Sequence, residues 1–202
     1  MIILTENKDI ELIEELYRVN GGELENINEF GIRNPAKKSL SVWNDVIGMY
    51  DRSEKMIFLK EATTDPSRWW TLNHRKGVDN LTEGFHNHIW ALGKHRGKLA
   101  FVQGPRKITT IRDTNRNFEI DPGDEIVSDE AWWGIDHHTT YRPVKTLGII
   151  GKASAGCQVD KHWIEFEHTR DIAKASGQPL YSYLLMALKA ENKYFYNLVY
   201  GE

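Results

Sequence analysis

The stretch DVIGMYDRSEKMIFLK, residues 45–60, decides the fold class of this chain. Its two apolar runs, 45–50 and 55–60, are rich in residues that strands favour. The polar residues 51–54 between them are typical of a hairpin loop. The pattern therefore predicts two antiparallel strands joined by a short turn.

Further short runs of the same kind follow, separated by turn residues such as Asp121-Pro122-Gly123. Many short strands with frequent turns favour a β-sandwich or a β-barrel with a few helices. We therefore expect a mainly β protein with flanking helices, of the α+β class. The additional strand candidates are residues 88–93, 99–103, 107–112 and 148–151.

Helical patterns flank these strands. In residues 6–19, apolar side chains recur at helical spacing, and Asn20-Gly21-Gly22 supplies the stop. Residues 161–175 predict a second helix. Residues 181–188 fit either a final strand or the start of a terminal helix, and residues 24–30 are ambiguous. We expect residues 1–40 to form a helical extension packed on a single domain of residues 41–202.

Composition narrows the function classes. The chain has 202 residues, a net charge of −3 and a pI of about 6.3, which argues against a general nucleic-acid binder. One cysteine excludes a disulfide scaffold and a cysteine-rich zinc site. The first residues lack the basic and then apolar pattern of a signal peptide, so we expect none. No apolar run approaches the roughly 20 residues of a membrane span. We expect synthesis in the cytoplasm, with delivery by another system if the substrate lies outside the membrane.

The single cysteine, Cys157, stands in the segment Ser154-Ala155-Gly156-Cys157. A lone cysteine is more often a buried structural thiol than a nucleophile. Here small residues precede the sulfur, so a substrate carbonyl can approach closely. The backbone N–H groups of Gly156 and Cys157 are candidates to stabilise a developing oxyanion. The segment therefore predicts a nucleophilic cysteine.

A histidine pair, His137-His138, lies 19 positions upstream of Cys157 when counted from His138. Neighbouring side chains on an extended strand point to opposite faces, so only one of the two can easily meet the sulfur. We take His138 as the general base and Asp136 as a candidate to orient its ring. His137 is a candidate substrate-binding residue.

Other polar and aromatic residues supply a weaker pattern. His86 and His88 have the spacing that places two side chains on one face of a strand, which is compatible with zinc ligation. A metal-dependent hydrolase using His86, His88 and His138 is therefore an alternative, although we expect neither metal nor cofactor and assign His88 to a substrate groove. Trp133 is expected to line the site, and Arg142 to hold a substrate carboxylate.

A histidine followed after some fifteen to twenty residues by Ser-x-Gly-Cys resembles the signature of L,D-transpeptidases with the YkuD-type catalytic domain. Over residues 43–187 the chain is also similar to a set of bacterial and phage proteins related to that family. The stretches that carry this likeness are residues 62–66, 90–95, 111–115, 134–138 and 154–159.

The resemblance implies a sandwich-like β fold and a cysteine that attacks peptidoglycan stem peptides. It implies Cys157 as nucleophile, His138 as base, the Gly156–Cys157 backbone as oxyanion hole and Ser154 as a nearby hydrogen-bonding group. The chain departs from the family pattern at three positions. Thr139 replaces a glycine, Ala155 replaces a second histidine, and Val159 replaces an arginine.

These observations predict a cysteine acyl-transfer enzyme acting on a peptidoglycan peptide, by hydrolysis or by transpeptidation, as in a phage or effector lytic enzyme. The first alternative is a catalytically silent wall-binding or virion structural module with the same fold. The second is the metal-dependent hydrolase. An intracellular amidase with another substrate also fits. The sequence does not determine the bond attacked or the oligomeric state.

Overall fold

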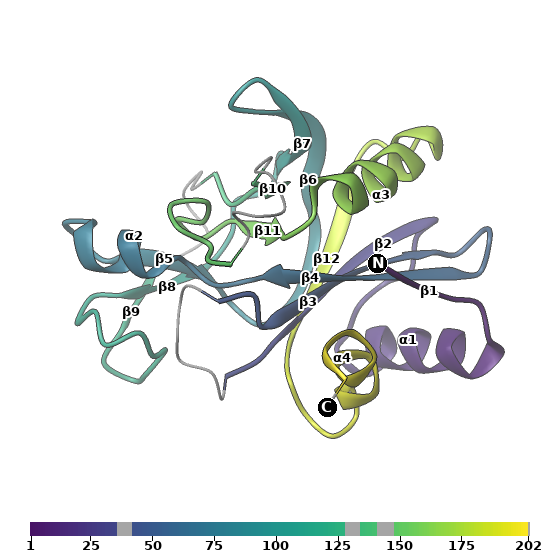
Figure 1. The fold of residues 1–202 in the computed structure, drawn as a ribbon, viewed down its shortest axis with the longest axis horizontal. Coiled ribbons are helices and arrows are strands. Elements are labelled where there is room, and N and C mark those ends of the chain that lie inside the picture. Colours follow the sequence, from purple (N-terminus) through teal and green to yellow (C-terminus); the bar gives the residue numbers. More distant parts are fainter. Residues whose placement is uncertain (36–41, 128–133, 141–147, 202) are drawn as a thin grey trace.

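The computed structural model describes residues 1–35, 42–127, 134–140 and 148–201. Figure 1 shows strands at the centre of the molecule with helices around them. In chain order the elements are β1 (Ile2–Leu4), α1 (Asn7–Val19), β2 (Ile27–Arg33), β3 (Asp45–Asp51), β4 (Met56–Thr63), α2 (Arg68–Asn73), β5 (Val78–Leu81), β6 (Gly84–His95), β7 (Lys98–Gln103), β8 (Thr110–Asp113), β9 (Glu125–Val127), β10 (His137–Thr139), β11 (Gln158–Asp160), α3 (Trp163–Ala175), β12 (Tyr181–Ala187) and α4 (Lys193–Tyr200).

The barrel closes through eight of the described strands, in the order β4-β11-β10-β7-β6-β12-β2-β3, with β3 pairing back onto β4. β1 lies outside this ring and pairs with the first half of β4. A separate sheet of β5, β8 and β9 stands beside the barrel with α2 (Figure 1). The expectation of a mainly β, α+β fold is therefore confirmed, with a barrel as its centre.

Side chains alternate between the barrel interior and its outer face. The interior core includes Trp90, Phe101 and Tyr183, and α3 adds Phe166 to it. α1 and α4 cover the outer face of β2, β3 and β4, where Ile13 and Phe195 belong to a second apolar cluster. Because both faces of these strands are covered, β2 and β3 are buried along their whole length.

A cluster of basic and acidic side chains lies inside the barrel, fully shielded from solvent: Lys60, Asp160, His137 and Glu29. The Nζ atom of Lys60 is 2.7 Å from an Asp160 carboxylate oxygen and donates a hydrogen bond to Thr169 of α3. The imidazole of His137 lies between Asp160, at 3.3 Å, and Glu29, at 3.5 Å. Burial works to raise the pKa of Asp160, but the charges of Lys60 and His137 outweigh it and lower that pKa. The interior therefore holds a Lys60–Asp160 ion pair, with His137 and Glu29 beside it, as well as apolar packing.

Several expected elements are confirmed and others differ. The helix near residues 6–19, the 45–60 hairpin and the helix near 161–175 all form, and residues 181–187 are a strand. The strand expected at 148–151 is wrong: these residues form turns, Gly151 has a φ of +65°, and Ile149 is exposed. The boundary expected near residue 40 does not divide the barrel, because β2 pairs with β12 on one side and β3 on the other.

Candidate functional site

The candidate site lies where β10 and β11 run side by side. These strands pair in parallel, with His137 opposite Gln158 and His138 opposite Val159. The backbone N–H of Gln158 also donates to the Asp136 carbonyl, at 2.9 Å. Residues 134–138 and 154–159, which are far apart in sequence, therefore meet through main-chain hydrogen bonds.

Alternation along the two strands sorts the candidate residues between two faces. His137 points into the barrel, where its ring stacks on Phe101 with centroids 5.4 Å apart. His138 and Val159 share the outer face, and Cys157 packs with Val159 in a small apolar cluster there. The structure thus places His138 on the side of Cys157 and encloses His137 in the core.

The thiol of Cys157 is buried, with 7% of the residue exposed. Its Sγ donates to the carbonyl oxygen of Gly134 at 3.4 Å. Burial raises the pKa of Cys157 to about 12, against the opposite effects of the Asp136 backbone N–H and the charge of Arg96. In this state the sulfur is a protonated thiol.

The imidazole of His138 is held by its own strand and by a second histidine. Its Nδ1 is 3.0 Å from the Thr139 carbonyl, so Nδ1 carries the proton and Nε2 presents a lone pair. Among the described residues Nε2 has no hydrogen-bond partner, and none joins Cys157 to His138. Burial, and next the neighbouring His95, lower the pKa of His138 to about 4. His138 is therefore a neutral imidazole with an unoccupied base nitrogen.

The loop before Cys157 is fixed by the hydroxyl of Ser154. That hydroxyl donates to the Cys157 carbonyl at 2.8 Å and accepts the backbone N–H of Gly156 at 3.2 Å. The Ser154 carbonyl in turn accepts the backbone N–H of Ser67. Gly156 has a φ of +121°, which side chains rarely allow. The Gly156 N–H, an expected oxyanion donor, is thus engaged by Ser154 in this state.

His95, which the sequence pattern did not assign to the site, belongs to it. Its Nδ1 is 2.7 Å from the Asp136 carboxylate. Its ring stacks on His138, with centroids 4.1 Å apart and planes 8° apart. The strand candidates 88–93 and 99–103 flank His95, and the structure pairs them as a hairpin with His95 near its tip.

The alternative of a metal-dependent hydrolase requires His86, His88 and His138 to share one metal, but these three histidines contact different partners. His86 Nε2 lies 2.8 Å from the Thr82 carbonyl, and His88 Nε2 lies 2.8 Å from Glu25. His138 is on the β10 strand with the neighbours described above. Within the part of the chain that the structure describes, no cluster of three or more metal-ligating side chains is present. Trp133 and Arg142 lie outside the described residues.

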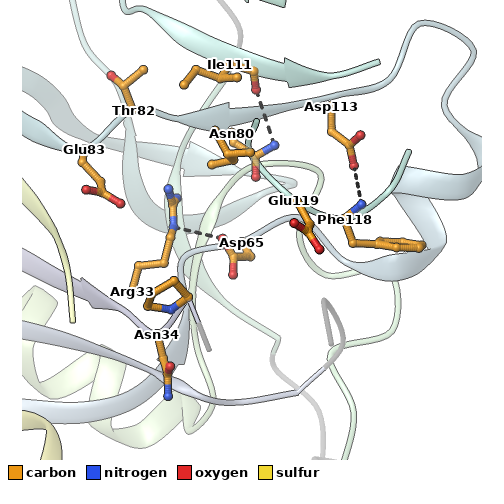
Figure 2. A pocket seen from close by; sticks show the side chains of 12 residues that line it. Arg33, Asn34, Asp65, Asn80, Thr82, Glu83, Ile111, Asp113, Phe118 and Glu119 are labelled. Atoms are coloured by element: carbon orange, nitrogen blue, oxygen red, sulfur yellow. Dashed lines mark hydrogen bonds and ion pairs between the residues drawn. The ribbon is translucent and has the colours of Figure 1, made fainter. Parts of the chain in front are cut away.

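A cavity of about 600 Å³ lies between the barrel end and the small sheet (Figure 2). Its walls include Asp65, Asp113 and Glu119, and its arginine, Arg33, is paired with Asp65 at 2.9 Å. Asn80 of β5 also lines it, while the preceding residue, Asp79, contacts the Cys157 loop through its carbonyl. Neither Cys157 nor His138 lines this cavity, so it is a neighbour of the candidate site rather than its reacting centre.

Alkylation of Cys157 should become faster with rising pH and show no plateau in the neutral range. Because the pKa of the thiol is about 12, the thiolate fraction grows about tenfold per pH unit below that value. Rates of modification by iodoacetamide, measured by mass spectrometry between pH 7 and pH 9, should follow this slope. A cysteine in a short blocked peptide serves as the reference, and its rate should rise less than tenfold per pH unit as the pH passes its ordinary pKa of about 8.5. A protein rate that is flat from pH 6 upward would instead indicate a preformed thiolate–imidazolium pair.

None of the described helices combines the length and apolar composition that crossing a bilayer requires. Comparison with known protein families, with curated proteins and with solved structures finds no match to this chain.

Proposed function

We propose that this protein is a cysteine-dependent acyl-transfer enzyme that acts on peptidoglycan stem peptides. The observation that carries the proposal is the pairing of β10 with β11, which brings the strand of His138 beside the segment that Cys157 leads into. The free Nε2 of His138 adds a base without a competing partner among the described residues. A nucleophile beside a base whose tautomer is fixed is the arrangement that acyl-transfer sites use.

The shifted pKa values favour a neutral thiol and a neutral imidazole before substrate binds. In the proposed first step, His138 Nε2 accepts the thiol proton while Sγ forms a bond to the amide carbonyl carbon. The carbonyl oxygen becomes an oxyanion. When the tetrahedral intermediate collapses, the C–N bond breaks, and the imidazolium returns its proton to the leaving amine. Water then hydrolyses the thioester, or a second amine accepts the acyl group.

Backbone N–H groups surround the sulfur from two segments. Those of Asp136 and Ala155 lower the pKa of the Cys157 thiol against the effect of burial, so they favour negative charge at this point. The Gly156 N–H would join them if it exchanged the Ser154 hydroxyl for the substrate oxyanion. Ser154 is then the group that holds this donor in place between turnovers.

A second candidate is the catalytically silent module that binds the cell wall. The raised pKa of Cys157 favours it, as does the lack of a hydrogen bond between Cys157 and His138 among the described residues. The resemblance of residues 134–138 and 154–159 to the L,D-transpeptidase signature fits both candidates. They differ in one respect, which is whether covalent chemistry occurs at the sulfur.

Digestion of purified peptidoglycan separates the two candidates. Wild-type protein should release muropeptides whose masses identify the bond attacked, and Cys157→Ala should lower the rate at least about 10³-fold, because no other group replaces the nucleophile. His168→Ala is the matched control, since His168 is an exposed histidine on α3 that contacts Phe58 rather than the site. Products from Cys157→Ala at the wild-type rate, or none from any variant, would contradict the proposal.

A further inference from the structure

The tip of the hairpin between β6 and β7 is strongly basic. Its sequence, Lys94-His95-Arg96-Gly97-Lys98, holds three permanent cations and no acid. Lys94, Arg96 and Lys98 are exposed. Figure 1 shows this hairpin extending beyond the barrel, on the side where β10 and β11 lie. A protein with a net charge of −3 therefore presents a concentrated positive surface at one point.

This tip is attached to the candidate site. His95 holds the Asp136 carboxylate through Nδ1 at 2.7 Å and stacks on the His138 ring. The other carboxylate oxygen of Asp136 accepts the backbone N–H of Gln103 in β7 at 2.8 Å. Asp136 thus links both strands of the hairpin to the segment that leads into β10. The position of the tip over the site is fixed by these contacts.

Arg96 is the residue of the tip best placed to bind a ligand. Its φ of +49° and the φ of +81° at Gly97 form the tight turn that projects its side chain from the hairpin. Its charge reaches Cys157, where it acts to lower the thiol pKa. No ion pair or hydrogen bond to the Arg96 guanidinium occurs among the residues that the structure describes.

We propose that Arg96 is a substrate-binding residue that holds a carboxylate next to the amide attacked by Cys157. The inference rests on the proposed function and adds a substrate class: peptides with a free carboxylate close to the reacting bond. A guanidinium binds a carboxylate through two parallel hydrogen bonds, which fixes orientation as well as charge. His95 and Asp136 are positioning residues for this subsite, since they anchor the hairpin to β10.

Binding to a protein that cannot turn over tests the subsite. In a Cys157→Ala background, titration calorimetry would compare a synthetic stem tetrapeptide ending in a free carboxylate with its C-terminal amide. The acid should bind at least about tenfold more tightly, because charge-assisted hydrogen bonds to arginine are lost with the amide. Adding Arg96→Gln should abolish the preference, and Arg96→Lys should retain part of it.

Lys55→Gln is the matched control. Lys55 lies at the tip of the β3–β4 hairpin and has a φ of +53°, so the change removes a cation from a turn of equal backbone strain. This variant should keep the full preference for the acid. Equal binding of acid and amide, a preference that survives Arg96→Gln, or no binding of either peptide would overturn the subsite.

The same peptides separate this inference from the proposed function. If protein with Cys157 intact cleaves both peptides at equal kcat/KM, the proposed acyl-transfer function is supported and the carboxylate subsite is contradicted. If the acid is bound selectively through Arg96 but no cleavage occurs, the subsite stands and the acyl-transfer reaction fails. If both hold, Arg96→Gln should lower kcat/KM for the acid more than for the amide, chiefly by raising KM for the acid.

Discussion

Lys60→Met is expected to destabilise the protein by about 3–5 kcal/mol, which is the usual cost of removing one partner from a buried ion pair. The Lys60–Asp160 pair is completely enclosed in the barrel, at 2.7 Å. Methionine fills a similar volume but leaves the Asp160 carboxylate with His137 as its remaining partner. Urea unfolding followed by tryptophan fluorescence would measure the change in the free energy of unfolding.

The chain offers a matched control one residue further along the sequence from each partner. Glu61 and Lys161 also form an ion pair, but their side chains are 29% and 24% exposed. Lys161→Met should cost less than about 1 kcal/mol, because water solvates the remaining charge. The double change Lys60→Met with Asp160→Asn should recover part of the loss by removing the orphaned charge. Equal costs for Lys60→Met and Lys161→Met would contradict the role of the buried Lys60–Asp160 pair.

Gly156→Ala should disable the site more completely than any other single methyl group added there. A Cβ at this position would lie 2.4 Å from the Asp79 carbonyl oxygen and 2.7 Å from an Ile135 carbon. Because the first of these atoms is backbone in β5, the 154–157 loop must move. A shift of about 1 Å in a reacting group costs about 10²-fold in rate, so muropeptide release should fall at least that far.

Gly84→Ala separates this steric effect from backbone strain. Gly84 has a φ of +125°, nearly that of Gly156, but a Cβ there meets no atom within 4 Å. The Gly84→Ala variant should therefore lose only about 1–2 kcal/mol of stability, from backbone strain, and should keep its activity. Parallel thermal unfolding and digestion assays on the two variants would make the comparison. If Gly156→Ala behaved like Gly84→Ala in both assays, close packing against β5 would not matter for the site.

Local patterns predicted the elements whose structure is decided locally. The 45–60 hairpin combines apolar runs with a polar turn, and both the turn and the strands form. Residues 24–30 were ambiguous because β2 places Glu29 inside the barrel, and only the distant Lys60, His137 and Asp160 explain a carboxylate there. The strand predicted at residues 148–151 was wrong, because two isoleucines between glycines have the pattern of a buried strand. Gly151 instead adopts a turn conformation.

Part of the candidate site was predictable, because local sequence motifs mark two of its segments. The spacing of His138 and Cys157 marks two segments, and the structure brings these onto adjacent strands. Whether Cys157 acts as a nucleophile stays a prediction. His95 could not be assigned from its neighbours, because its partner Asp136 is 41 residues away in sequence. The pKa values of Cys157 and His138 also depend on burial, which no local pattern reports.

The order of strands around the barrel has a consequence for synthesis on the ribosome. β12 is the last described strand in the chain, yet it joins β2 to β6 and so completes the ring. Until it emerges, the nascent sheet has two unpaired edges, at β2 and β6, of the kind that invites pairing with other chains. Until then the aromatic interior around Trp90 stays open to solvent and to chaperones. Closure of the barrel therefore requires that residues 181–187 have been released.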